Sequence, residues 1–287
     1  MKATAFAPGH ISCFFEPVYH NEDIFRTGSR GAGINLSLGT VSEVIVENSD
    51  VQNIEVYINN KPSSAPVTNM ALKYLIGDNP LHVTVKTKQD LPTGQGFGMS
   101  AAGALSSTLA LTKITNITMS DAMKASHYAE VKQRTGLGDV IASCFGGIEI
   151  RKSAGLPPWG LIEHISGDFD LVLCVVGKKI DTKKVLLDKS KTEKITEYGR
   201  YCTKKLLENP SIENLFSLSQ VFTRKTGLAD KTVIEAINST KQYGFASMCM
   251  LGNSVFAIGK TNQLSSVLSK FGKVYVCNID HAGARVL

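Results

Sequence analysis

The alternation of hydrophobic and polar positions predicts strands in the first half of the chain. Residues 41–48 (VSEVIVEN) and 81–87 (LHVTVKT) place apolar side chains at every second position, which is the period of a strand with one buried face. Residues 100–113 and 120–134 then carry helical patterns, and residues 146–152 (GGIEIRK) return to a strand pattern. The first half is therefore predicted to mix strands and helices.

The second of these predicted helices has a start signal in its own sequence. Ser120 is a suitable N-cap residue, and Asp121 places an acid in the first turn, where it interacts favourably with the helix dipole. We therefore expect this helix to begin at Ser120–Asp121.

The second half of the chain is predicted to begin after a segment rich in glycine and proline. Residues 153–161 (SAGLPPWGL) have the punctuation of a crossing between domains, so we predict an N-terminal domain over 1–158 and a C-terminal domain over 159–287. The pattern that follows predicts a buried strand at 169–177, three helices within 191–242 that are broken near Pro210 and Gly227, a strand at 254–259, a helix at 261–270 and a strand at 274–279. This order indicates an α+β fold with two domains.

Length and composition limit the classes of protein to consider. With 287 residues, of which 43% are hydrophobic and 20% are charged, the chain can bury a substantial core and is not expected to be disordered. The formal net charge is +6, but the densest lysine run, residues 177–194, is interrupted by acids and lacks interleaved aromatic residues. We interpret this run as a solvated helical face rather than a nucleic-acid surface, and we expect the positive charge to favour an acidic small-molecule ligand.

The cysteines and the N-terminus give no sign of export or of a metal framework. The six cysteines form no CxxC pair and several lie in apolar runs, so we expect buried, reduced thiols. Pro8 and His10 interrupt the short apolar region at the N-terminus, which lacks the cleavage pattern of a signal peptide. No apolar run approaches the roughly 18 residues of a membrane span. We therefore expect a cytoplasmic protein with no nucleic-acid or membrane partner.

A glycine-rich loop between a predicted strand and a predicted helix carries the first chemical signal. In LPTGQGFGMSAAGALSSTLAL (91–111), Pro92 ends the regular ladder, and Gly94, Gly96 and Gly98 permit positive φ and close backbone approach. The helix that begins near Ser100 leaves backbone N–H groups and its positive dipole end facing one point, which favours a phosphate. The alternative is a glycine-rich turn that binds no ligand.

The loop does not match the two commonest phosphate-binding patterns. It has no lysine, so the Walker A pattern GxxxxGK[ST] is excluded. The string GFGMSA satisfies the dinucleotide pattern GxGxxA, but a second helix follows in place of a short strand ending in an acid. A dinucleotide-dependent oxidoreductase therefore stays only a distant alternative.

Two acids downstream of the loop are candidates for chemistry. Glu130 lies near the end of the second predicted helix, and Asp139 follows Gly136 and Gly138 in TGLGDV. An acid directly after a glycine turn can face the same cavity as the loop. Taken alone, Glu130 could be a solvated helical carboxylate and Asp139 a plain helix N-cap.

Four segments in order resemble the motifs of the GHMP kinase superfamily. LPTGQGFGMSAAGALSS resembles its phosphate-binding motif, roughly P-x-x-x-G-L-G-S-S-A-A, and TGLGDVIASCFGG resembles its catalytic-aspartate segment. APGHI (7–11) is similar to its first motif, and MCMLGNSVFAIG (248–259) occupies the place of its third. The strings PGHISCFFEPV, GSRGAGINLS, AEVKQRTGLGDV and the terminal GARV resemble, more narrowly, the archaeal members that phosphorylate pantoate.

This resemblance implies a fold and a reaction. The fold would be an N-terminal ATP-binding domain like ribosomal protein S5 domain 2 and a ferredoxin-like C-terminal domain, with the active site in the cleft between them. The reaction would be ATP- and Mg²⁺-dependent phosphorylation of pantoate to 4-phosphopantoate in archaeal coenzyme A synthesis. Alternatives are another kinase of the superfamily, acting on homoserine, shikimate or a mevalonate-type substrate, and a non-catalytic nucleotide-binding member. A homodimer is possible for such kinases.

The resemblance also assigns nucleotide and metal roles residue by residue. Asp139 would be the catalytic aspartate, as a base or a positioning group, and Ser100 and Glu130 would bind Mg²⁺. Met99 replaces the first serine of the motif. The ATP-binding set would be Pro92, Gly94, Gln95, Gly96, Phe97, Gly98, Met99, Ser100 and Ala101.

Substrate contacts are assigned with the carboxylate of pantoate in mind. Arg30 is the first candidate for a bidentate cation and Arg151 the second, because guanidinium groups match carboxylates. His10 stands where several relatives carry a lysine; we expect it to hydrogen-bond the substrate, the alternative being a role in the fold. Ser29 and Asn253 complete the predicted contacts.

Overall fold

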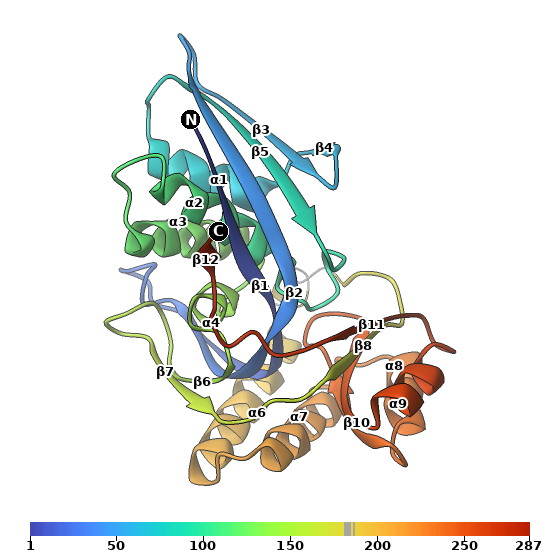
Figure 1. Cartoon of the computed structure of the whole chain (residues 1–287). Coiled ribbons are helices and arrows are strands. Elements are labelled where there is room, and N and C mark those ends of the chain that lie inside the picture. Colours follow the sequence, from blue (N-terminus) through green and yellow to red (C-terminus); the bar gives the residue numbers. More distant parts are fainter. Residues whose placement is uncertain (181–184, 186) are drawn as a thin grey trace.

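The computed structural model describes residues 1–180, 185 and 187–287 and arranges them around two β-sheets (Figure 1). Apart from the C-terminal strand β12, the larger sheet holds strands from the first part of the chain, and the smaller sheet holds strands from the second part. Both ends of the chain meet in the larger sheet, because β1 (Lys2–Val18) pairs with β12 (Arg285–Val286).

Two long antiparallel strands form the spine of the larger sheet. β1 pairs with β2 (Gly28–Asn48) along nearly its whole length, with register shifts at Pro8/Gly9 and Ser12/Phe14. One half of β2 pairs with β5 and the other half with β6, so the sheet order is β12-β1-β2-β5-β3-β4, with β6 and β7 attached to β2. The remaining strands are β3 (Asn53–Ile58), β4 (Lys61–Ser63), β5 (Leu81–Gln89), β6 (Ile148–Ser153) and β7 (Leu161–Ile165).

Helices cover one face of this sheet, with α2 (Met99–Thr112) in the middle (Figure 1). α2 contacts β1 and β2 on one side and three neighbouring helices on the other, so most of its side chains are buried. Its alanine-rich sequence suits this position, because small side chains allow close packing on all sides. The neighbouring helices are α1 (Pro66–Ile76), α3 (Met119–Gln133) and α4 (Asp139–Phe145).

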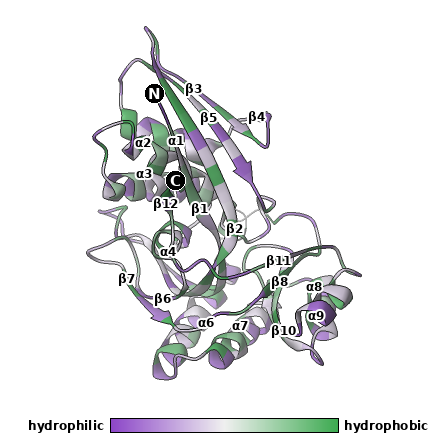
Figure 2. Ribbon diagram, in the orientation of Figure 1, coloured by the Kyte–Doolittle hydropathy of each residue, from purple (hydrophilic) through white to green (hydrophobic). Residues whose placement is uncertain are grey.

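The smaller sheet is antiparallel, with the order β11-β8-β10-β9. Helix α7 connects it to the larger sheet, because α7 contacts both β9 and β1. Helix α6 packs against α7 and β1, with buried residues at Ile195, Gly199, Cys202 and Leu206, the spacing of one helical face. Figure 2 shows hydrophilic and hydrophobic positions alternating along α6 and α7. The elements are β8 (Leu171–Val175), α6 (Lys189–Glu208), α7 (Ile212–Thr226), α8 (Lys231–Ser239), β9 (Gly244–Met248), β10 (Ser254–Gly259), α9 (Thr261–Leu268) and β11 (Lys273–Cys277).

The elements predicted from periodicity are present. Each strand and helix predicted from the sequence overlaps an observed element of the same type, including the three helices of the second half, which are broken at Pro210 and Gly227. The prediction missed α1, α4, β3, β4, β7, β9, β12 and the long strand β1. β1 was missed because nearly all of it is buried on both faces, so it lacks the alternation that marks a half-buried strand.

One local prediction was wrong. The N-cap of α3 is Thr118, two residues before Ser120, and Thr118 and Asp121 form a reciprocal capping box. Residues 153–161 connect β6 to β7 within the larger sheet and are therefore no crossing between sheets. The predicted division at 158/159 falls between these paired strands, and the domain limits stay a prediction.

The expected state of the cysteines is confirmed, since all six are buried and free. In the lysine-rich run, Lys189, Lys191 and Lys194 are exposed on α6, as predicted. The part of that prediction that concerns residues 181–184 and 186 lies outside the described residues. None of the helices in the described ranges is long and apolar enough to cross a membrane.

The contact between α6 and β1 can be tested at a helical glycine. A Cβ at Gly199 would lie 2.0 Å from the carbonyl oxygen of Phe15, whereas a Cβ at Gly103 in α2 would meet only Thr68 Oγ1 at 3.7 Å. Alanine improves helix propensity at both positions by about 1 kcal/mol. We expect Gly199→Ala to destabilise the protein by about 1–3 kcal/mol because of overpacking, and Gly103→Ala to be neutral or stabilising. Urea unfolding of both variants measures this, and equal stability of the two would contradict the close contact.

Candidate active site

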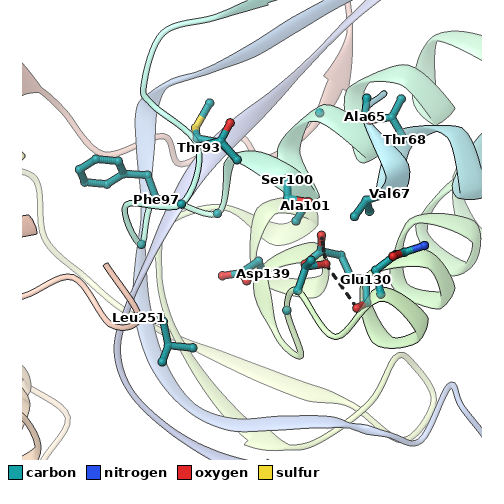
Figure 3. Close-up of a pocket in the computed structure, with 18 of the residues that line it drawn as sticks. Ala65, Val67, Thr68, Thr93, Phe97, Ser100, Ala101, Glu130, Asp139 and Leu251 are labelled. Atoms are coloured by element: carbon teal, nitrogen blue, oxygen red, sulfur yellow. Dashed lines mark hydrogen bonds between the residues drawn. The ribbon is translucent and has the colours of Figure 1, made fainter. Parts of the chain in front are cut away.

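A cavity of about 770 Å³ lies where the glycine-rich loop, α3 and the start of α4 meet (Figure 3). Segments next to the smaller sheet also contribute to its wall, since Met250 and Leu251 follow β9 and Lys179 and Ile180 follow β8. Figure 3 shows Ser100, Glu130 and Asp139 around the same part of the cavity. The phosphate-type loop and both candidate acids therefore share one site.

The loop has the conformation that its glycines allow. Gly94, Gly96 and Gly98 have φ values of 77°, 75° and 62°, all in the left-handed region that side chains disfavour. Gly98 is the N-cap of α2, so the N–H groups of the first turn have no acceptor inside the helix. The residues that carry them, Met99, Ser100 and Ala101, line the cavity. This geometry suits an anion such as a phosphate chain.

Two segments far from the loop in sequence hold it in place. The backbone N–H of His10 in β1 donates to the carbonyl of Phe97 at 2.9 Å. On the other side, a Cβ at Gly96 would lie 2.7 Å from the carbonyl oxygen of Met250, so the turn after β9 packs directly on the loop backbone. The segments 7–11 and 248–259 therefore both support the glycine-rich loop.

Glu130 is a buried carboxylate beside the start of α2. Thr135 Oγ1 donates to its Oε1 at 2.9 Å, and Ser100 also makes a side-chain hydrogen bond to it. Burial raises the pKa of Glu130 to about 7, and the negative charge of Asp139 acts in the same direction. A Cβ at Gly136 would lie 2.2 Å from Glu130 Oε2 and 2.7 Å from Asp139 Oδ2, so the absence of a side chain there lets the two acids approach one region.

Asp139 is the first residue of α4, with Gly138 as the N-cap, and 23% of its side chain is exposed. Its Oδ1 lies 2.7 Å from Nδ1 of His10. Burial raises the pKa of Asp139, but the hydrogen bond and charge of His10 and the charge of Arg151 outweigh burial and hold it below its usual value. Asp139 is therefore ionised at neutral pH.

Behind Asp139, a row of charged side chains continues into the protein. His10 Nε2 lies 3.1 Å from Oε1 of Glu149, and Nη1 of Arg151 donates to the same oxygen. Burial lowers the pKa of His10, but the charge of Glu149 and the hydrogen bonds of Asp139 and Glu149 raise it above the ordinary value. His10, Glu149 and Arg151 have no exposed surface.

Most of the site residues predicted from the sequence come together around the cavity. The predicted residues that line it are Ser29, Gly94, Gly96, Phe97, Gly98, Met99, Ser100, Ala101, Glu130 and Asp139. The predicted residues that do not line it are His10, Arg30, Pro92, Gln95, Arg151 and Asn253. His10 and Arg151 stand behind the wall, in the buried row described above.

Three of the predicted contacts are engaged elsewhere. Gln95 donates to the carbonyl of Gly177 at 2.9 Å and accepts from Ser254, which ties the loop to the smaller sheet. Asn253 donates to the carbonyl of Lys178 at 2.8 Å. Arg30 donates to the carbonyl of Lys152 at 2.9 Å and to Glu16 at 3.2 Å. Their predicted ligand contacts stay predictions.

The sequence analysis missed two parts of the wall. Residues 63–68, at the end of β4 and the start of α1, line the cavity but carry no charge or glycine pattern that marks a site. Lys179 is the one cation among the described lining residues, and its Cβ would lie 3.0 Å from a Cβ at Gly94. It was missed because it belongs to the lysine-rich run that we interpreted as a solvated face.

Known proteins resemble this chain along nearly its full length. The sequence profile of the GHMP kinases N terminal domain matches residues 66–147. The pantoate kinase of Methanocaldococcus jannaschii is 34% identical over 274 residues, which cover 96% of this chain and 99% of the relative. The pantoate kinase of Thermococcus kodakarensis is 36% identical over 265 residues, covering 90% of this chain and 88% of the relative. A solved structure described as a phosphotransferase related to the CoA biosynthesis pathway has a TM-score of 0.90 and 32% identity, covering 100% of this chain and 99% of that one.

The environment of Glu130 predicts an unusual pH dependence of stability. The pKa of Glu130 is about 7 in the folded protein against an ordinary 4.5, so the free energy of unfolding falls as the pH rises from about 4.5 to about 7. In Glu130→Gln this pH-dependent loss of stability should be absent, because a glutamine side chain does not titrate. Without divalent cations, the variant should match the wild type near pH 4.5 and exceed its stability above pH 7, by up to about 3 kcal/mol.

Urea unfolding at several pH values measures the effect, and Asp139→Asn is the matched control. The lowered pKa of Asp139 means that its charge stabilises the fold, so this variant should lose stability at neutral pH. A difference between Glu130→Gln and the wild type that does not change with pH would contradict the raised pKa of Glu130.

Proposed function

Because this chain belongs to the pantoate kinase family of the GHMP kinase superfamily, we propose that it transfers the γ-phosphoryl group of ATP to the primary hydroxyl of pantoate. The product, 4-phosphopantoate, belongs to coenzyme A synthesis. The observation that carries the proposal is the placement of the phosphate-type loop and an ionised Asp139 on the wall of one cavity.

The loop and Asp139 divide the reaction between them. The N–H groups at the start of α2 bind the phosphate oxygens and spread their negative charge, which is the main contribution a protein makes to phosphoryl transfer. Asp139 accepts a hydrogen bond from the substrate hydroxyl and aligns its oxygen with the γ-phosphorus. The proton moves to Asp139 as the new P–O bond forms and the bond to ADP breaks.

Ser100 and Glu130 fit a Mg²⁺ site. They offer a hydroxyl and a carboxylate beside the loop, the hard oxygen ligands that Mg²⁺ requires, and phosphate oxygens complete such a site. The raised pKa of Glu130 is consistent with a carboxylate that lacks a cationic partner in the protein alone. When bound, Mg²⁺ supplies positive charge to the β- and γ-phosphate oxygens.

The end of the cavity near Ser12 and Ser29 suits the carboxylate of pantoate. Both serines line the wall, and Arg151 stands directly behind them with Nη2 3.3 Å from Ser12 Oγ. Its Nε has no hydrogen-bond partner among the described residues. We propose that the hydroxyls of Ser12 and Ser29 contact the carboxylate, and that the buried Arg151 acts behind them through its charge and its hydrogen bond to Ser12, whereas Arg30 is held by Glu16 and Lys152.

A substrate panel tests the proposed reaction. The purified protein with ATP and Mg²⁺ should release ADP in step with phosphopantoate when pantoate is the acceptor. Asp139→Asn should still bind ATP but lose at least ~10²-fold in turnover. Reaction with homoserine, shikimate or mevalonate and none with pantoate would overturn the substrate, and full activity of Asp139→Asn would remove Asp139 from the mechanism.

Lys179 is proposed to supply the cation that the loop itself lacks. Among the described lining residues, the charged side chains are the acids Glu130 and Asp139 and the cation Lys179. A triphosphate bound at the loop therefore has Lys179 as its counterion in this part of the wall. Lys179→Ala should raise the KM for ATP by about 5- to 30-fold, the loss of about 1–2 kcal/mol of charge-assisted binding. Lys178→Ala is the matched control, since Lys178 is also exposed but does not line the cavity. Equal KM values for the two variants would contradict this role.

A further inference from the structure

The buried row behind Asp139 is a second feature of the site that substrate contact alone does not explain. Asp139, His10, Glu149 and Arg151 follow one another, and of these four only Asp139 lines the cavity. Glu149 does not line the cavity, and its side chain is fully buried. One of its oxygens, Oε2, has no hydrogen-bond partner among the described residues.

The sheet is built to bring this row together. His10 is on β1 and Glu149 on β6, the two strands that flank this part of β2. Gly33 of β2 lies between them, and a Cβ there would be 2.2 Å from His10 Nε2 and 2.9 Å from Glu149 Oε1. The histidine and the carboxylate therefore meet across the central strand only because that strand has no side chain at this position.

The two acceptors define the protonation of His10. Its Nδ1 faces Oδ1 of Asp139 at 2.7 Å and its Nε2 faces Oε1 of Glu149 at 3.1 Å. An ionised carboxylate can only accept, so both ring nitrogens must donate and the ring is an imidazolium. Arg151 Nη1 also makes a long contact of 3.4 Å with the same Nε2, but its much shorter hydrogen bond is the one to Glu149 Oε1.

The charges of the row balance only with that proton. Two carboxylates, Asp139 and Glu149, alternate with two cations, His10 and Arg151. Burying a carboxylate without a partner costs several kcal/mol, so Glu149 holds His10 in the charged form and His10 in turn pairs with Asp139. The orientation of the catalytic carboxylate is thus set from behind, on rigid strands.

We propose that Glu149 is a positioning residue that acts through His10: its Oε1 accepts from Nε2 and thereby directs the Nδ1–H of the imidazolium at Oδ1 of Asp139. This holds the Asp139 carboxylate ionised and oriented towards the substrate hydroxyl. The inference rests on the proposed function, in which Asp139 serves that hydroxyl. Glu149 itself never contacts substrate or nucleotide.

The kinetic test compares Glu149→Gln, His10→Gln and the double variant, using the acceptor that the wild type turns over best. Glu149→Gln should lower kcat by about 10-fold or more and leave the KM values for ATP and acceptor within about twofold. The double variant should be no slower than His10→Gln, because a residue that acts only through His10 has no further effect once His10 is gone. Effects of the two single variants that multiply would overturn the proposal.

The pH profile of kcat adds a readout that a purely structural role would not move. Asp139 faces His10, Arg151 and the negative charge of Glu130, so loss of the imidazolium makes it easier to protonate. The acidic limb of the profile should therefore shift to higher pH in Glu149→Gln. Asp280→Asn is the control, because Asp280 is also a buried carboxylate but pairs with Arg285 and Gly283 away from the cavity; its limb should not move. An unmoved limb in Glu149→Gln would overturn the proposal.

A measurement on the wild type tests the protonation of His10 without any variant. Its result does not depend on which acceptor the enzyme phosphorylates. Nitrogen-15 NMR of labelled histidine should show both ring nitrogens of His10 protonated at neutral pH, whichever acceptor the enzyme uses. A neutral His10 ring would overturn the proposal even if pantoate proves to be the substrate. A charged ring in a protein without pantoate turnover would support the row and contradict only the substrate.

Discussion

His10 connects the two halves of the site through two hydrogen bonds from one residue. Its backbone N–H holds the glycine-rich loop at Phe97, at 2.9 Å, and its side chain holds Asp139, at 2.7 Å. Because both bonds start from β1, one of the two long strands of the larger sheet, the glycine-rich loop and the acid are held in fixed positions relative to each other. The transfer of a phosphoryl group depends mainly on such placement, since there is little covalent chemistry for the protein to perform.

The two acids of the cavity are placed in opposite electrostatic surroundings. Glu130 has hydroxyl donors but no cationic partner, so burial raises its pKa to about 7. Burial also raises the pKa of Asp139, yet His10 and Arg151 behind it lower this pKa below the ordinary value. One carboxylate is thus suited to gain a metal ion as its counterion, and the other to remain an acceptor for a hydroxyl proton at neutral pH.

Much of this arrangement could be predicted, for reasons that differ from residue to residue. The loop glycines were identifiable because positive φ at Gly94, Gly96 and Gly98 excludes most other residues, and the long helices because their apolar faces repeat. The predicted α+β fold of the GHMP kinase superfamily is confirmed by a relative of known structure with a TM-score of 0.90. Strand β1 was missed because it is buried on both faces and has no clear period, whereas α1 was missed although its buried residues follow a helical spacing.

The sequence by itself determined the chemical groups of the site: a glycine loop before a helix, the hydroxyl of Ser100, and the acids Glu130 and Asp139. These are local patterns, and local backbone rules suffice to recognise them. Only the tertiary structure decided that Glu149 stands behind His10 across Gly33, and that Lys179 lies against Gly94. Such contacts join residues more than 80 positions apart, and their strength depends on distance and burial, which no spacing along the chain encodes.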